Sequence, residues 1–110
     1  MQKGDLLEPK SEKILIGVPE GVPRALVAGY LERCRSGLPL LEASVRQNQH
    51  EQTRVLGHRM RGTGRPYGFS RLTEIGALLE DAAAHQNSGA LREYVAELAE
   101  YLSRVEIARD

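Results

Sequence analysis

Apolar residues recur at helical spacing over most of the chain, and in the first stretch they step by four and three positions in alternation, which is the spacing of one face of an α-helix. Pro39 falls inside the first such stretch but off its apolar face. A proline inside a helix removes one backbone hydrogen bond and bends the helix, so we expect one bent helix rather than two. The apolar stripe of this helix is Val27, Leu31, Cys34, Leu38, Leu41 and Val45.

Three more helices are predicted further along. The second runs from about Glu51 to about Arg65, Ser70 is placed to cap the third, and "QNSG" (86–89) separates the third from the fourth. Four amphipathic helices with short polar links predict an all-α fold, an antiparallel up-down-up-down four-helix bundle. The last two stripes are Leu72, Ile75, Gly76, Leu79, Ala82 and Ala83, then Leu91, Tyr94, Val95, Leu98, Leu102 and Val105.

The beginning of the chain has a different pattern. Residues 1–12 are polar, contain Gly4 and Pro9, and are expected to form a flexible lead-in. "KILIGV" (13–18) is short, apolar and β-branched, which favours an extended segment. Because no second strand is evident, we expect it to lie unpaired against the bundle surface. Residues 1–18 therefore form a lead-in with an extended segment, and residues 19–110 form the helical bundle.

Composition narrows the class of protein. The 110 residues suit one domain, and the 15 basic and 15 acidic residues cancel, which argues against a nucleic-acid partner. Cys34 is the single cysteine, so an intrachain disulfide and a thiolate zinc site are excluded. No apolar run approaches the ~20 residues of a membrane span, and the N-terminus lacks the apolar core of a signal peptide. We expect a small free-standing monomer in the cytoplasm, with no membrane partner.

His58 is the candidate for chemistry, because the helical wheel turns it outward. A helix turns about 100° per residue, so Leu56 and Met60 lie about 160° from His58, with Thr53 and Thr63 at about 140°. These four residues are apolar or small and are expected to face the core. Within about 60° of His58 lie, among others, Glu51, Arg54, Arg61, Gly62 and Arg65.

The ordinary alternative is a surface histidine without a role, and we interpret His50 and His85, near helix ends, in that way. For His58 this leaves Gly62 unexplained, since a glycine inside a helix costs roughly 1 kcal/mol relative to alanine. Gly62 lies one turn away over the same patch, which suggests that something bulky approaches the ring. Gly57, Gly64 and Gly68 are consistent with packing or turns.

Other site chemistries are poorly supported. The three histidines lack the spacing that places two imidazoles on one metal ion, so no metal site is expected. A serine-type hydrolase is disfavoured because neither a nucleophile elbow nor a carboxylate partner is evident. Kinase activity on ATP is not expected, since the chain has no phosphate-binding glycine loop between a strand and a helix.

"GHRMRGTGRPYGFSRLTEIGALLEDAA" (57–83) resembles the signature of histidine phosphotransfer (HPt) domains of bacterial two-component relays. The helical pattern from about Arg24 to Val105 extends the resemblance over most of the chain. The family usually has lysine where this chain has Arg61, and Pro66 is unexpected because it disfavours helical geometry at Arg65. The positions that match are His58, Arg61, Gly62, Gly68, Phe69, Leu72 and Glu80.

The resemblance implies that His58 accepts a phosphoryl group from a receiver-domain phosphoaspartate, or through a histidine kinase pathway, and passes it to another receiver. Arg61 would stabilise the phosphoryl oxygens. Gly62 would leave room for the receiver, and an apolar patch around Val55 would help it dock, beside Arg54 and Arg65. The outer ring nitrogen is expected to attack. No cofactor of its own is implied, since Mg²⁺ belongs to the receiver.

Two alternatives remain. One is a binding module that docks on a receiver or a kinase without relaying phosphate, which Arg61 and Pro66 leave open. The other is a purely structural helical domain in which the motif occurs by chance.

Overall fold

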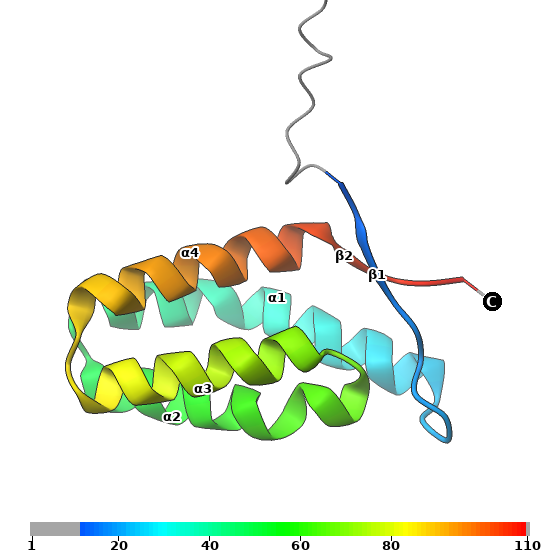
Figure 1. The fold of residues 1–110 in the computed structure, drawn as a ribbon, viewed down its shortest axis with the longest axis horizontal. Coiled ribbons are helices and arrows are strands. Elements are labelled where there is room, and N and C mark those ends of the chain that lie inside the picture. The colour runs from blue at the N-terminus through cyan, green and yellow to red at the C-terminus, as the bar shows by residue number, and fades with distance from the viewer. Residues whose placement is uncertain (1–11, 110) are drawn as a thin grey trace, which may run out of the picture.

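The computed structural model describes residues 12–109, and four α-helices form most of it. The helices run alternately in opposite directions, as Figure 1 shows, and the predicted all-α four-helix bundle is confirmed. Residues 1–11, most of the predicted lead-in, lie outside the described residues. The helices are α1 (Arg24–Arg46), α2 (His50–Thr63), α3 (Ser70–Ala84) and α4 (Ser88–Arg104), with a short 3-10 helix η3 (Arg65–Tyr67) after α2 and strands β1 (Ile14–Ile16) and β2 (Val105–Ile107).

The helix α1 continues past Pro39, which confirms one helix rather than two. Pro39 is exposed, and its ring therefore does not disturb the packed face. Four of the six residues in the predicted stripe are buried, and Cys34 and Leu38 are half-buried. The periodicity of the sequence thus identified the inner face of this helix correctly.

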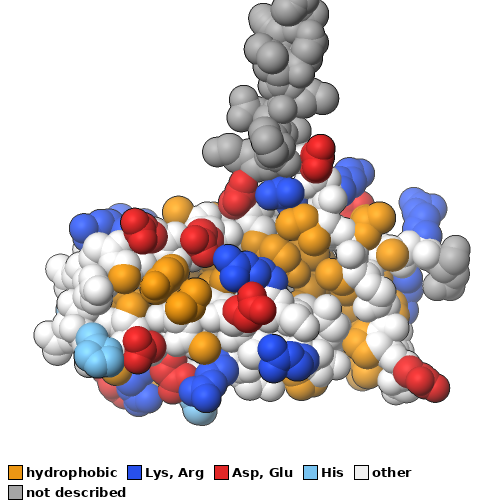
Figure 2. Space-filling view, viewed as in Figure 1, with side chains coloured by type: hydrophobic (Ala, Val, Ile, Leu, Met, Phe, Trp, Pro, Cys, Tyr) orange, Lys and Arg blue, Asp and Glu red, His pale blue; other side chains and the backbone are white. Residues whose placement is uncertain are grey.

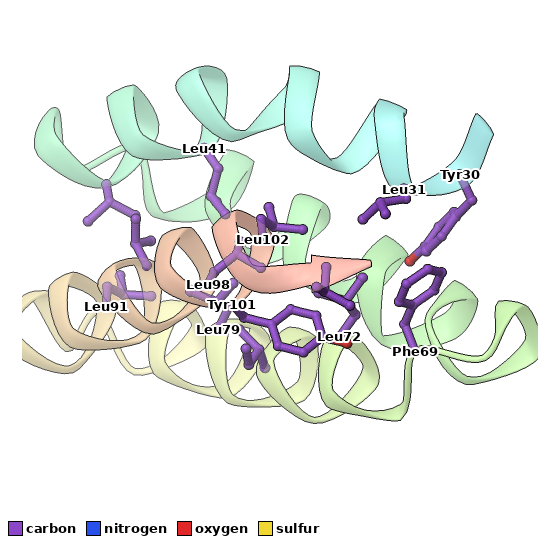
Figure 3. Packing of buried hydrophobic residues seen from close by; sticks show 14 of the residues in the cluster. Tyr30, Leu31, Leu41, Phe69, Leu72, Leu79, Leu91, Leu98, Tyr101 and Leu102 are labelled. Carbon is purple, nitrogen blue, oxygen red and sulfur yellow. The ribbon is translucent and has the colours of Figure 1, made fainter. Parts of the chain in front are cut away.

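The core lies along the axis of the bundle. All six residues of the predicted α3 stripe are buried, and so are most of those predicted for α4. Figure 3 shows leucines from α1, α3 and α4 pointing toward one another, with Tyr30 and Phe69 at one end. Tyr30 stacks on Tyr67, with ring centroids 4.6 Å apart, and lies 5.7 Å from the Phe69 ring. These aromatic contacts fix η3 against α1.

The extended N-terminal segment has a partner strand, so the expectation of an unpaired segment is wrong. β1 pairs in parallel with β2, with Ile14 opposite Val105 and Ile16 opposite Ile107. The sequence stripe placed Val105 on the fourth helix, but α4 ends at Arg104. Val105 is still fully buried, because a strand leaving a helix can direct the same side chain into the core. Arg35 stabilises this exit by donating hydrogen bonds to the carbonyls of Leu102 and Val105.

Two details of the helix ends also differ from prediction. Ser70 does not cap α3: it is the first helical residue, and its neighbour Phe69 occupies the cap position without a side-chain hydrogen bond. By contrast, the Asn87 side chain does cap α4, accepting a hydrogen bond from the Ala90 amide at 3.1 Å.

The helix α2 ends at Thr63, two residues earlier than predicted, and Pro66 lies in η3. The backbone stays right-handed helical at Gly64 and continues into η3 from Arg65, so the end of α2 is a tightening into a 3-10 turn.

The helices α2 and α3 touch backbone to backbone through glycines. A Cβ atom on Gly57 would lie 2.8 Å from the Glu80 amide nitrogen, and one on Gly64 would lie 2.6 Å from that of Thr73. A Cβ on Gly76 would collide with the Arg61 backbone and lie 2.8 Å from the Gly57 carbonyl oxygen. Packing this close is open only to residues without a side chain, so the glycines predicted as packing residues have that role. This close packing allows side chains of α2 to form hydrogen bonds with side chains of α3.

Candidate functional site

His58 lies on the outer surface of α2, as the helical wheel predicted. Its side chain is 66% exposed. Thr53 faces inward as predicted and is buried, whereas Leu56 and Met60 are half-buried against the core. Thr63, also predicted to face inward, is exposed because it lies in the last turn of α2, although its hydroxyl bonds the Tyr30 hydroxyl at 2.8 Å. The imidazole is therefore open to a large visiting molecule.

Glu80 is the partner of His58, and the sequence analysis missed this role. Glu80 Oε2 lies 3.0 Å from His58 Nδ1, and Glu80 Oε1 accepts a 3.0 Å hydrogen bond from Arg61. No carboxylate partner was evident from the sequence, and the structure provides one in Glu80. The two residues are 22 positions apart in the sequence. They meet only because glycines allow the backbones of α2 and α3 to approach closely. The available signal was that Glu80 matches the family signature.

The electrostatics of this group keep Glu80 ionised. Its pKa is lowered chiefly by the hydrogen bond from Arg61, with a further contribution from His58. An ionised carboxylate accepts hydrogen bonds and donates none, so His58 Nδ1 must carry the proton that it shares with Glu80. No described residue bonds the other ring nitrogen, Nε2. The arrangement thus fixes the ring orientation and leaves Nε2 for an incoming group.

We predict that Arg61→Gln raises the pKa of Glu80 toward its ordinary value of 4.5, and that His58→Ala raises it less, because the Arg61 hydrogen bond is the larger cause. A carboxyl group with a lowered pKa stabilises the fold above its unfolded pKa, and this contribution is lost as pH falls through the folded value. NMR titration of the Glu80 carboxyl carbon measures the shift. Arg92→Gln, at an exposed position of α4, is the matched control, and an unchanged pKa in Arg61→Gln would contradict the assignment.

Arg61 and Gly62 lie where the sequence predicted, one turn after His58. Glu80 contacts one terminal nitrogen of the exposed Arg61 guanidinium, and a guanidinium carries five N–H donors, so further donors remain for an anion beside the ring. A Cβ on Gly62 would meet nothing within 4 Å. Packing inside the domain therefore does not require a glycine there, in contrast to Gly57 and Gly64.

The other predicted site residues are less closely gathered. Arg54 pairs with Glu51 through two hydrogen bonds of 3.0 and 2.7 Å, and it borders, with Arg61 and Glu80, a hollow of about 340 Å³ between α2 and α3. Val55 is half-buried on α2. Arg65 lies in η3, beyond the end of α2, so the helical wheel does not place its side chain beside His58.

The two remaining histidines lie apart from this group. The ring of His85 contacts the Asp81 carbonyl at 2.9 Å within its own turn. His50 is half-buried at the start of α2, and its buried Nε2 has no hydrogen-bond partner among the described residues, so it is not the plain surface residue that we expected. Across residues 12–109, no group of three or more His, Cys, Asp or Glu side chains is arranged to hold a metal ion.

The charge on the surface is mixed in sign. Figure 2 shows acidic and basic side chains interspersed over one face of the bundle, as a chain without net charge allows. Within the described part of the chain, no helix combines the length and the apolar composition that a membrane span requires.

The family model of the Hpt domain matches residues 25–108, most of the chain. The chain therefore belongs to the Hpt domain family. Domains of this family are histidine phosphotransfer modules of phosphorelays, and they work with receiver domains and kinases. Neither a curated protein nor a solved structure matches the chain.

Proposed function

We propose that the protein is a phosphorelay intermediate. His58 accepts a phosphoryl group from a receiver-domain phosphoaspartate, or through a histidine kinase pathway, and passes it to another receiver domain. The observation that carries the proposal is the exposed imidazole whose Nδ1 is held by Glu80 while Nε2 stays free of described partners. The proposal includes a monomer acting in the cytoplasm.

The transfer step follows from this arrangement. The Nε2 lone pair attacks phosphorus in line with the leaving aspartate oxygen. The N–P bond forms, the O–P bond breaks, and the receiver's aspartate leaves as a carboxylate. The proton stays on Nδ1, so the phosphorylated ring is positively charged, and the Glu80 carboxylate at 3.0 Å stabilises that charge. The reverse step returns the phosphoryl group to a receiver.

Arg61 supplies positive charge beside the phosphoryl oxygens. In the unphosphorylated chain Glu80 holds one terminal nitrogen of Arg61, which keeps the guanidinium next to His58. Phosphoryl transfer depends mainly on positioning and on charge stabilisation, and a side chain that is already oriented loses little freedom when the phosphoryl group arrives. Arg61 replaces the usual lysine of the family, and its planar guanidinium group has enough N–H donors to bind Glu80 and the phosphoryl group together.

The receiver would dock over the outer face of α2. The open space at Gly62 admits the loop that carries its aspartate, Val55 provides apolar contact, and Arg54 and Arg65 face acidic groups of the partner. The chain needs no cofactor for this reaction, because the Mg²⁺ of the reaction is bound by the receiver.

The test is transfer itself. Incubating the protein with phosphorylated receiver domains and Mg²⁺ should label it with an acid-labile phosphate, and adding a second, unphosphorylated receiver should remove the label. A stable complex with a receiver, insensitive to His58→Ala and without phosphate on the chain, would contradict the relay and identify a binding module that does not relay phosphate.

A further inference from the structure

A second hollow lies between α1 and α2 and shares no residue with the hollow beside Glu80. This groove measures about 410 Å³, within the range of about 300–1,000 Å³ that is typical of small-molecule pockets. Its floor is apolar, and Figure 3 shows one floor residue, Leu41, pointing from α1 toward α4. The floor is made by Leu38, Leu41, Leu56, Met60 and Leu98.

The edges of the groove are positively charged. Arg33 from α1 and Arg59 from α2 line it, both are exposed, and neither guanidinium group has a hydrogen bond or an ion pair with a described residue. No acidic residue lines the groove. Burial raises the pKa of the Cys34 thiol, which also lines the groove, and the hydrogen bond with Tyr30 and then the Arg33 charge oppose this rise. A cation would be repelled here and an anion attracted.

One end of the groove has a polar boundary, formed by the hydroxyl groups of Tyr30 and Thr63, 2.8 Å apart. Gly37 has no side chain to fill this part of the groove, and a Cβ there would meet nothing within 4 Å. A whole α-helix, about 10 Å across with its side chains, needs a longer trough than a pocket of this volume provides. The groove therefore suits a slender apolar chain with one negative end.

We propose that this groove binds a single-chain aliphatic carboxylate, with the hydrocarbon over Leu56 and Met60 and the carboxylate between Arg33 and Arg59. The unpaired guanidinium groups provide charge-assisted hydrogen bonds, and the apolar floor provides the area that the chain removes from water. This site goes beyond the phosphorelay function and does not depend on it.

Decanoate, kept below its micellar concentration, is the probe, and binding is followed by calorimetry and by amide NMR shifts of the full chain. Saturable binding of one decanoate is expected, with shifts concentrated in the facing halves of α1 and α2. Arg33→Gln and Arg59→Gln should each weaken binding by about tenfold, the usual effect of losing a hydrogen bond to a charged group. Decanol should bind more weakly than decanoate.

Gly37→Leu provides a variant that should fold well and still lose the site. Leucine is the better helix former, so thermal stability should rise, while its side chain occupies the groove and abolishes binding. Ala28→Leu adds a similar side chain at an exposed position of α1 outside the groove and should bind as the wild type does. Equal binding of decanol and decanoate, undiminished binding by Gly37→Leu, or shifts scattered over the whole bundle would each overturn the proposal.

Discussion

His58→Gln is expected to abolish phosphorylation of the protein while leaving its fold intact. A glutamine amide nitrogen has its lone pair delocalised into the carbonyl group, so it cannot replace Nε2 as the nucleophile. The side chain at this position is 66% exposed and makes no core contact, so thermal stability should change little. Intact-mass spectrometry under neutral conditions, after incubation with a phosphorylated receiver, measures the loss of the phosphoryl adduct.

His85→Gln is the matched control. His85 is also exposed and also near a carboxylate, with Asp81 Oδ1 3.6 Å from its Nδ1, but no described arginine pairs with Asp81 as Arg61 pairs with Glu80. Labelling of His85→Gln should equal that of the wild type. Efficient labelling of His58→Gln would show that another residue accepts the phosphoryl group.

Gly76→Ala is expected to cost stability and transfer together. The added methyl group would collide with the Arg61 backbone and with the Gly57 carbonyl oxygen, and backbone atoms cannot rotate away as a side chain can. The helices α2 and α3 must separate, which costs about 1–3 kcal/mol of unfolding free energy. Separation also lengthens the reach from Glu80 to His58 and Arg61, so phosphorylation should slow. Urea unfolding and single-turnover transfer measure the two effects.

Gly62→Ala tests the opposite situation on the same helix. Its methyl group would enter open space, and alanine is the better helix former, so unfolding free energy should rise by up to about 1 kcal/mol. Both variants make the same chemical change, and the sign of the stability change should depend on whether α3 lies against the glycine. A Gly76→Ala protein as stable as the wild type would refute the close backbone packing.

The sequence was most informative where one helix face decides the structure. The buried stripe of α3 and the outward position of His58 both follow from the turn angle of a helix, which is a local property. The single helix through Pro39 was likewise predictable, because an exposed proline bends a helix without ending it when the flanking apolar stripe is continuous.

Contacts between distant segments were less accessible. Glu80 meets His58 because glycines on two helices coincide, and the periodicity showed Gly76 only as a member of an apolar stripe. The strand β2 was hidden because Val105 continues the spacing of the α4 stripe, so a buried position looked helical while its backbone is extended. Pairing between β1 and β2 joins residues about ninety positions apart, and no local pattern reports such a partner.

The parallel pairing of β1 with β2 has a mechanical consequence. The chain enters β1 at Ile14 and leaves β2 at Ile107, and the two strands point in the same direction. A force that pulls the two ends of the domain apart therefore acts along the strands and in opposite senses on each. The hydrogen bonds between them are loaded in shear, so they resist together instead of opening one after another, and the bundle is protected when the chain is stretched.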